Sequence, residues 1–460
     1  METKNGLSRR SFLKSGAMAS ALGAIGTGTG AATILSSCSS QEEKKPAYTP
    51  LRPQSEIYIP YLTDKAIDGK PLKAGIIGCG GRGSGAAFNF LDAADNVTIT
   101  ALADVFQERV DGLRNTLKEK RNIDIPAENC FVGFDAYQKV IDSGVDVVLI
   151  CTPPVFRPEQ FKYAVEKNKH SFLEKPVAAD AAGYRQVVAS SKQAVAKGLC
   201  VITGTQRHHQ RCYVASYQKV QEGLIGEITG GVVYWNQSML WYRNREKNWT
   251  DVEWMIKDWV NWTWLSGDHI VEQHVHNIDV YNWFTGQKPS SAVAFGSRQR
   301  RITGNQYDNF STDFVYPGGV HMHSMCRQID GCVNNVSEFI QGTLGTWDSK
   351  TFEIKDLQGN VVWKYDFEQQ DKEFKQNDPY VLEHVDWITH IRKNEPFSEA
   401  EDTAISTLCA VMGRVSAYTG SEVTWDAMSA ADQNLLPADL SLATKMPEST
   451  YVIPVPGSAK

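Results

Sequence analysis

The run GCGGRG at residues 78–83 constrains this chain of 460 residues more than any other segment, because it fixes glycines at a tight spacing. It directly follows the apolar run LKAGII at residues 72–77 and precedes a helix-like segment. In that setting Gly78 permits a tight turn, Gly80 lets backbone amides approach a pyrophosphate, and Gly83 allows close helix packing. The N-terminus of the helix then faces the phosphates. We expect a dinucleotide-binding turn formed by Gly78, Gly80, Gly81, Arg82 and Gly83.

A carboxylate ends the second predicted strand. Asp104 follows the run VTITALA and lies 21 residues after Gly83, where a carboxylate would bind the 2′-hydroxyl of the adenosine ribose. Because an anionic Asp104 would repel a 2′-phosphate, we predict NAD rather than NADP as the cofactor. The alternative is a structural glycine turn in an unrelated α/β domain.

Two types of pattern divide the chain. Over residues 72–205, unbroken apolar runs alternate with helical patterns, which is typical of a parallel sheet covered on both faces. We therefore predict a doubly wound Rossmann domain there, of the α/β class. Over residues 206–430, strand-like runs alternate with turns and few helices, which predicts an α+β domain built on a large, mainly antiparallel, open sheet. Residues 431–460 form a proline-bearing tail.

The N-terminus resembles an export signal rather than part of a folded domain. Arg9 and Arg10 precede Phe-Leu-Lys and a weakly apolar stretch that is too rich in glycine for a good membrane-spanning helix. The stretch ends in LSSC, which resembles a bacterial lipobox, so we expect lipid on Cys38. We predict a twin-arginine signal over residues 1–37 and a tether over 38–71. The chain is then exported to the periplasmic side and anchored to the inner or outer membrane. A basic tail with an incidental cysteine is the alternative.

Such export carries folded proteins, which predicts a tightly held cofactor. The formal net charge of −6 makes a nucleic-acid partner unexpected.

Eight of the twelve tryptophans lie between Trp235 and Trp283. Aromatic faces beside hydrogen-bonding side chains suit a sugar ring, and core packing or an oligomer seam is the competing use. From this window, the candidate substrate contacts are Trp259, Trp262 and Arg243.

Two short motifs end the fourth and fifth predicted strands: Thr152-Pro153-Pro154 and Glu174-Lys175-Pro176. A strand, TPP, a helix and EKP after a dinucleotide turn resemble the glucose-fructose oxidoreductase, inositol dehydrogenase and MocA family, over about residues 72 to 425. The resemblance implies a second domain whose open sheet face carries substrate and mediates homo-oligomers, here a dimer or tetramer. It also implies that Lys175 reaches the nicotinamide ribose and the substrate hydroxyl. Further cofactor contacts are expected at Thr152, Pro153 and Glu174.

The same family has an aspartate and a histidine four residues apart, followed by an aspartate three residues on. Here His276 and Asp279 match the last two, and Glu272 stands where the first aspartate is usual. Residues so spaced share one face of a helix, and imidazole can take and return a proton near neutral pH. We therefore expect Lys175, Glu272, His276 and Asp279 to be the catalytic residues.

Other polar clusters are less specific. Gln206, Arg207 and His208 follow the last predicted parallel strand, at the edge where such sheets bind ligands. His269, His274 and His276 could be drawn as a metal site with Glu272, but their spacing matches no common zinc pattern. We expect no metal.

Three functions fit these observations. The first is an NAD-dependent oxidoreductase acting on a sugar or polyol, in which His276, oriented by Asp279 or Glu272, takes the hydroxyl proton and Lys175 stabilises the alkoxide. Because free NAD is scarce outside the cytoplasm, the cofactor must be reset in place, by a second substrate or by the same one. The latter resembles an NAD-dependent glycosidase working through a transient 3-keto sugar, which needs a second base, His208 or Tyr242. The third is a non-catalytic sugar-binding lipoprotein.

Overall fold

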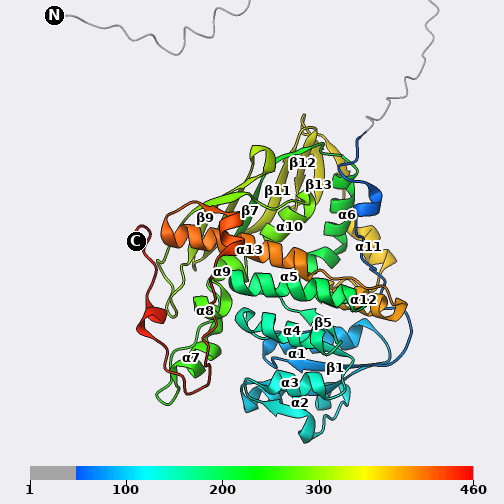
Figure 1. The fold of residues 1–460 in the computed structure, drawn as a ribbon. Coiled ribbons are helices and arrows are strands. Elements are labelled where there is room, and N and C mark those ends of the chain that lie inside the picture. The colour runs from blue at the N-terminus through cyan, green and yellow to red at the C-terminus, as the bar shows by residue number, and fades with distance from the viewer. Residues whose placement is uncertain (1–47, 459–460) are drawn as a thin grey trace, which may run out of the picture. The chain divides into compact units, whose positions relative to one another are not determined.

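A computed structural model describes residues 48–458, so the predicted signal, Cys38 and the first part of the tether lie outside the described residues. From Tyr48 onward the chain forms one compact unit that contains two sheets, with the first near the bottom of Figure 1 and the second near the top. No helix in the described part of the chain is long and apolar enough to cross a membrane.

The first sheet confirms the predicted Rossmann domain. Its six strands are all parallel, in the order β3-β2-β1-β4-β5-β6. The apolar residues of the central strand β4 are all buried, because helices cover both faces of the sheet. The strands are β1 (Leu72–Ile77), β2 (Val97–Asp104), β3 (Cys130–Val132), β4 (Val147–Ile150), β5 (His170–Leu173) and β6 (Val201–Thr203). The helices are α1 (Gly81–Ala93), α2 (Gln107–Arg121), α3 (Ala136–Asp142), α4 (Arg157–Glu166) and α5 (Ala181–Ala196).

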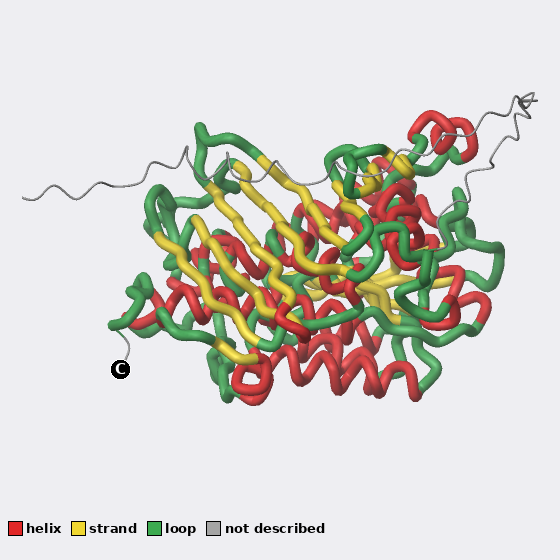
Figure 2. The backbone as a smooth tube through the Cα atoms, turned by 90° about the horizontal axis from the view of Figure 1, so that it is seen from above, coloured by secondary structure: helices red, strands yellow, loops and turns green. Residues whose placement is uncertain are grey.

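The second sheet confirms the predicted open, mainly antiparallel sheet. Its order is β14-β13-β12-β11-β7-β10-β9-β8-β15, and only the β7–β10 pair is parallel. Burial alternates along β9 because helices α10 and α13 cover one face, whereas the other face is open in Figure 2. The strands are β7 (Ile228–Gln237), β8 (Ser291–Ser297), β9 (Asn309–Tyr316), β10 (Val320–Gln328), β11 (Asn335–Gly342), β12 (Gly345–Asp348), β13 (Glu353–Asp356), β14 (Val361–Lys364) and β15 (Val423–Thr424).

One helix of the second region packs back on the first domain. Trp387 and Ile388 of α12 share a buried cluster with Ile76 and Phe90, so the two domains share part of their core. The helices after β6 are α6 (Arg211–Gln221), α7 (Asp251–Lys257), α8 (Thr263–Ser266), α9 (His269–Glu272), α10 (Val275–Thr285), α11 (Phe367–Glu373), α12 (Pro379–Lys393), α13 (Ala400–Thr419) and α14 (Trp425–Ala430).

The tether prediction is wrong for residues 48–71, which pack on this body. The Tyr58 hydroxyl donates to the buried Asp386 carboxylate at 2.5 Å, and the Tyr61 amide donates to the other oxygen of Asp386 at 2.7 Å. Ile57 and Ile59 pack against the core of the second domain. The segment lacks a periodic pattern because it follows the surface of the body and forms almost no regular structure.

We expect Tyr58→Phe to lower the free energy of unfolding by about 1–2 kcal/mol, because it removes a hydrogen bond to a buried charge. Urea titration of the two proteins measures the difference. Tyr48→Phe, in the same segment, is the matched control and should change stability little. Equal stability of wild type and Tyr58→Phe would show that the Tyr58–Asp386 hydrogen bond does not stabilise the fold.

Candidate functional site

The glycine turn has the backbone that the sequence predicts. Gly78 has φ +94°, and a Cβ there would lie 2.8 Å from the carbonyl carbon of Cys151. A Cβ on Gly83 would lie 1.8 Å from the Gly78 oxygen, so α1 can approach β1 only with glycine at this position. A Cβ on Gly80 would meet only the guanidinium of Arg109, at 2.7 Å. The turn is therefore closed against β4 and open on the side of Arg109.

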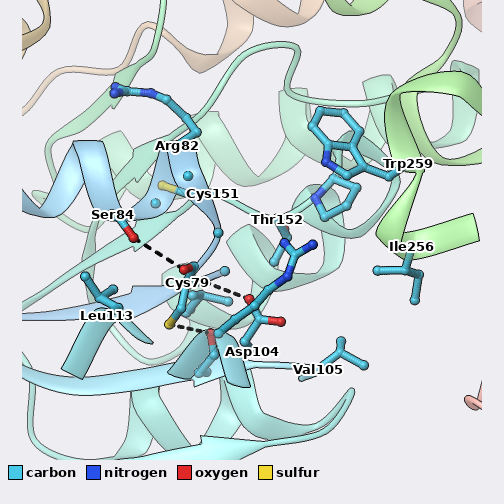
Figure 3. Close-up of a pocket in the computed structure, with 18 of the residues that line it drawn as sticks. Cys79, Arg82, Ser84, Asp104, Val105, Leu113, Cys151, Thr152, Ile256 and Trp259 are labelled. Carbon is cyan, nitrogen blue, oxygen red and sulfur yellow. Dashed lines mark hydrogen bonds between the residues drawn. The ribbon is translucent and has the colours of Figure 1, made fainter. Parts of the chain in front are cut away.

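A cavity of about 680 Å³ lies beside this turn (Figure 3). The N-terminus of α1 has no side-chain cap, which leaves its first backbone amides available to an anion. These free amides, the bare Cα of Gly80 and Asp104 at the end of β2 fit a dinucleotide. Other lining residues from the first domain are Arg109, Tyr137, Thr152, Pro153 and Phe156, and those from the second region are Trp241, Arg243, Ile256 and Trp259.

Asp104 lies at the predicted position. One of its carboxylate oxygens accepts a hydrogen bond from the amide of Cys79 at 2.8 Å (Figure 3). The other accepts from the amide of Phe106 at 3.1 Å. Burial raises the pKa of this carboxyl, and nearby Arg109 opposes the shift. The carboxylate is thus fixed between the glycine turn and the start of α2, where it can accept from ribose hydroxyls.

Arg82, which we predicted as a cofactor ligand, has its charge engaged elsewhere. Its Nε donates to the Glu174 carboxylate of the EKP motif, and its Nη2 lies 3.3 Å from Glu383 of α12. Both carboxylates are buried. Arg82 lines the cavity, but its guanidinium links the turn to β5 and α12, so it is not free to pair with phosphate.

The EKP motif carries Lys175 to the second domain. Its Nζ donates to the Glu272 backbone oxygen at 2.6 Å and lies 3.1 Å from Glu272 Oε1. Only 11% and 8% of the two side chains are exposed, so this ion pair is largely desolvated. The structure therefore brings together two of the four predicted catalytic residues, one from each domain.

His276 is buried and its ring is stacked on Trp235, with centroids 5.5 Å apart. Burial lowers the pKa of His276 well below the ordinary 6.5, and the positive charges of Lys175 and Arg207 lower it further. The imidazole is therefore neutral at neutral pH and able to accept a proton.

The predicted catalytic helix is broken. Helix α9 ends at Glu272 and α10 begins at Val275, so Glu272 and His276 do not follow one continuous helix. At the break, Nε2 of His274 lies 2.6 Å from the hydroxyl of Ser324 on β10. This tertiary contact fixes the chain where local periodicity predicts an uninterrupted helix.

Asp279 does not orient His276 as predicted. Its carboxylate lies 2.7 Å from Nε2 of His208, whose ring stacks on Trp283 with centroids 4.3 Å apart. Burial lowers the pKa of His208, but Asp279 outweighs it and the pKa rises to about 9. Glu272 also makes no hydrogen bond to His276 among the described residues, because it binds Lys175 and Gln273. His208 is protonated at neutral pH, so it is unsuited to the role of a second base.

The remaining substrate candidates separate in space. Arg207 forms a buried ion pair with Glu338 of β11 at 2.7 Å. Trp262 is 2% exposed and packs edge-on against Trp254, so it is a core residue. Trp259 and Arg243 line the cavity beside the glycine turn. Gln206 lies in a short 3-10 helix (Gln206–His209), and its side-chain oxygen is buried without a hydrogen-bond partner in the described structure.

Sequence reasoning missed Arg157, although this residue fixes both motif loops. Its Nε donates to the Thr152 oxygen at 2.7 Å, and its Nη1 donates to the oxygens of Glu174 at 2.9 Å and Pro176 at 2.5 Å. Arg157 is 3% exposed. In the sequence it opens an ordinary amphipathic helix, and its only signal is its place three residues after the TPP motif.

Comparisons with known proteins agree with this geometry. The model of an oxidoreductase family with an NAD-binding Rossmann fold matches residues 72–205, and the model of the GFO/IDH/MocA C-terminal domain matches residues 213–347. The first domain is therefore an NAD-binding Rossmann domain, as predicted from the glycine turn.

Similar proteins include enzymes of two kinds. A glycosyl hydrolase family 109 protein from Streptomyces coelicolor is 27% identical over 235 residues, which is 49% of this chain and 44% of that protein. An inositol 2-dehydrogenase/D-chiro-inositol 3-dehydrogenase from Lactiplantibacillus plantarum is 26% identical over 233 residues, 51% of this chain and 58% of the relative. The matches thus span about half the length of these relatives.

The fold has a solved counterpart. A scyllo-inositol dehydrogenase from Lactobacillus casei, with bound NAD(H) and scyllo-inositol, aligns with a TM-score of 0.58 and 19% identity. The alignment covers 77% of this chain and 99% of that structure. The similarity extends through both domains.

The His208–Asp279 pair predicts a pH dependence of stability. Because the pKa of His208 is about 9 in the folded protein and about 6.5 when unfolded, the pair stabilises the fold fully below pH 6.5. This stabilisation is lost as the pH rises through 9. The free energy of unfolding of wild type, relative to His208→Asn, should fall by up to about 3 kcal/mol between pH 6 and pH 9.5.

Urea titrations of both proteins at the two pH values test this. His321→Asn, which changes an exposed histidine of β10, is the control and should follow wild type. A parallel pH dependence in wild type and His208→Asn would contradict the raised pKa.

Proposed function

We propose that this chain, which belongs to the GFO/IDH/MocA oxidoreductase family, is an NAD-dependent oxidoreductase of a polyol or sugar carbinol. The observation that carries the proposal is the desolvated Lys175–Glu272 pair near a neutral, buried His276. Bound NAD supplies the acceptor and donor of hydride. The chain's own residues supply the proton chemistry that must accompany it.

Each residue has a distinct role. His276 accepts the proton of the substrate hydroxyl, because its imidazole is neutral where an ordinary histidine is partly charged. Lys175 holds a positive charge that stabilises the alkoxide as the proton leaves. Glu272 keeps the ammonium group of Lys175 in place through two contacts. These carbinol-directed groups suit cyclic polyols and sugars, which carry many secondary hydroxyls.

A second candidate is an NAD-dependent glycosidase working through a transient 3-keto sugar. It is supported by the similarity to a glycosyl hydrolase family 109 protein. In this reaction the hydride returns to the sugar, so no net reduction of the cofactor remains. Elimination from the keto sugar needs a base at the C2 proton. Because His208 is protonated and paired, only Tyr242 remains of the two candidates from the sequence.

We expect Lys175→Met and His276→Asn to lower the rate of NAD reduction by inositols or aldoses by at least about 100-fold, since each removes a group that acts on the reacting hydroxyl. Bound NAD should remain, because the glycine turn and Asp104 are unchanged in both variants. NADH absorbance after substrate addition measures the rate. His323→Asn, on the open sheet face, is the control.

Near-normal rates in both variants would refute these roles. Release of aglycone from aryl glycosides without net NADH would favour the glycosidase. Neither reaction, with sugar binding retained, would favour a non-catalytic sugar-binding protein.

We also propose export, lipid attachment at Cys38 and assembly into a homo-oligomer, either a dimer or a tetramer. The signal motif at Arg9 and Arg10 and the lipobox support the first two. Exposed apolar side chains on the open sheet support the third, since Val293 is 43% and Phe295 76% exposed. An apolar patch of this kind on an open sheet can pair with a second copy of the chain.

The export proposal has a direct test by cell fractionation. We expect wild type in the membrane fraction and Cys38→Ser in the soluble periplasmic fraction, because the anchoring thiol is gone. Arg9→Lys combined with Arg10→Lys should hold the protein in the cytoplasm. Membrane attachment of Cys38→Ser would contradict lipidation at this residue.

A further inference from the structure

The tryptophan-rich segment lies over the cofactor cavity. Residues 238–262, here called the cover, connect β7 to α8 and include α7 and a short 3-10 helix, Trp259–Asn261. Trp241, Arg243, Ile256 and Trp259 of the cover line the same cavity as the glycine turn. In Figure 3, Ile256 and Trp259 lie on the side of the cavity formed by Val105 and Thr152. The cover thus forms a wall of the site that the first domain cannot supply.

The cover is fastened to the first domain next to this cavity. Nζ of Lys257 lies 2.9 Å from Glu108 of α2 and 4.5 Å from the centre of the Phe106 ring. A buried apolar cluster joins Phe106 and Val155, which follow β2 and β4, to Ile256 of the cover. The loops at the carboxyl ends of these strands are therefore packed beneath residues 238–262.

The C-terminal tail fastens the other side of the cover. The Leu442 oxygen accepts a hydrogen bond from the Thr250 hydroxyl at 2.5 Å, and the Met446 amide donates to Asp251 at 3.2 Å. Tyr451 packs edge-on against Trp262, with ring centroids 5.5 Å apart. Residues 442–451, part of the predicted tail, therefore hold the cover on this side, on the left of Figure 1.

The charges in the cavity indicate what the cover binds. The positive charge of Arg82 is engaged by Glu174 and Glu383. Within residues 48–458, the guanidinium groups of Arg109 and Arg243 form no hydrogen bond or ion pair, although both line the cavity. A dinucleotide pyrophosphate carries two negative charges, and guanidinium groups left free in this way can bind it in addition to the backbone amides of the glycine turn.

We propose that residues 238–262 retain NAD in its site, with Arg243 as a ligand of the pyrophosphate and Trp259 as an apolar wall that excludes water. This inference rests on the proposed function only in assuming that the site binds NAD. It assigns to Arg243 and Trp259 a contact with NAD, which differs from the sugar contact predicted from the sequence. NAD leaves only when the cover separates from α2. One cofactor molecule therefore serves consecutive turnovers.

The test measures cofactor release directly. Protein loaded with NADH is mixed with excess NAD, and the loss of energy transfer from tryptophan to NADH gives the rate of release. We expect Arg243→Gln and Trp259→Ala to release NADH faster than wild type by about tenfold or more, since each removes a contact worth at least about 1.4 kcal/mol. Lys247→Gln, which removes an exposed charge of the same segment outside the cavity, should release NADH like wild type.

A third variant tests whether attachment of the cover to the first domain, and not only direct contact with the cofactor, slows release. Lys257→Met removes the ion pair with Glu108 without changing the cavity lining, and we expect it to accelerate release as well. Melting temperatures of the cofactor-free proteins identify any variant that fails to fold.

The outcomes distinguish this inference from the proposed function. Equal release rates in wild type, Arg243→Gln, Trp259→Ala and Lys257→Met overturn the inference, even if polyols reduce the bound NAD. Faster release in these variants supports it, even if no polyol or sugar reduces the cofactor. Faster release that also occurs in Lys247→Gln overturns it, because the effect would then come from general loss of positive charge.

Discussion

The site depends on one buried guanidinium. Arg157 donates to main-chain oxygens of both motif loops and so joins the end of β4 to the end of β5. Burial lowers its pKa to about 10, against the opposing charge of Glu174, which still leaves Arg157 charged at neutral pH. Because Glu174 also binds Arg82, three motifs that are far apart in sequence form one network. Lys175, the next residue along the chain, is thereby aimed at Glu272.

The same network connects the domains. Arg82 reaches Glu383 on α12, and Lys175 reaches Glu272 on α9. Separating the domains would leave buried charges without partners, which costs far more than an exposed ion pair is worth. The position of the second domain over the carboxyl edge of the parallel sheet is therefore fixed in part by Lys175 and Glu272, two of the residues to which we assign the chemistry. In such a site, substitution of a positioning residue affects stability and activity together.

The features that could be predicted from the sequence are those that depend on neighbouring residues in the chain. The glycine turn and the buried strands follow from backbone sterics and apolar runs, and the structure has them at the predicted residues. The importance of the EKP loop came instead from the family resemblance. The partners of charged groups could not be predicted, because they come from distant segments. Asp279 fits a helical face with His276 but pairs with His208, and Trp259 fits a sugar platform but lines the cofactor cavity. Tertiary contacts determine which partner each side chain has, where sequence spacing alone allows more than one.

Two histidines near the site show how neighbouring groups determine the protonation state of an imidazole. Burial and nearby positive charges keep His276 neutral, whereas Asp279 keeps His208 protonated. A retained cofactor then narrows the possible cycles, since hydride that leaves one substrate must return to the same molecule or pass to a second. Since His276 is the neutral imidazole that we assign to the substrate hydroxyl, a cycle that moves one proton per half-reaction matches the site directly. A glycosidase cycle moves a second proton from carbon, and Tyr242 of the cover must then act as its base. Opening of the cover would remove that base together with the cofactor wall, so retention and elimination would depend on the same segment.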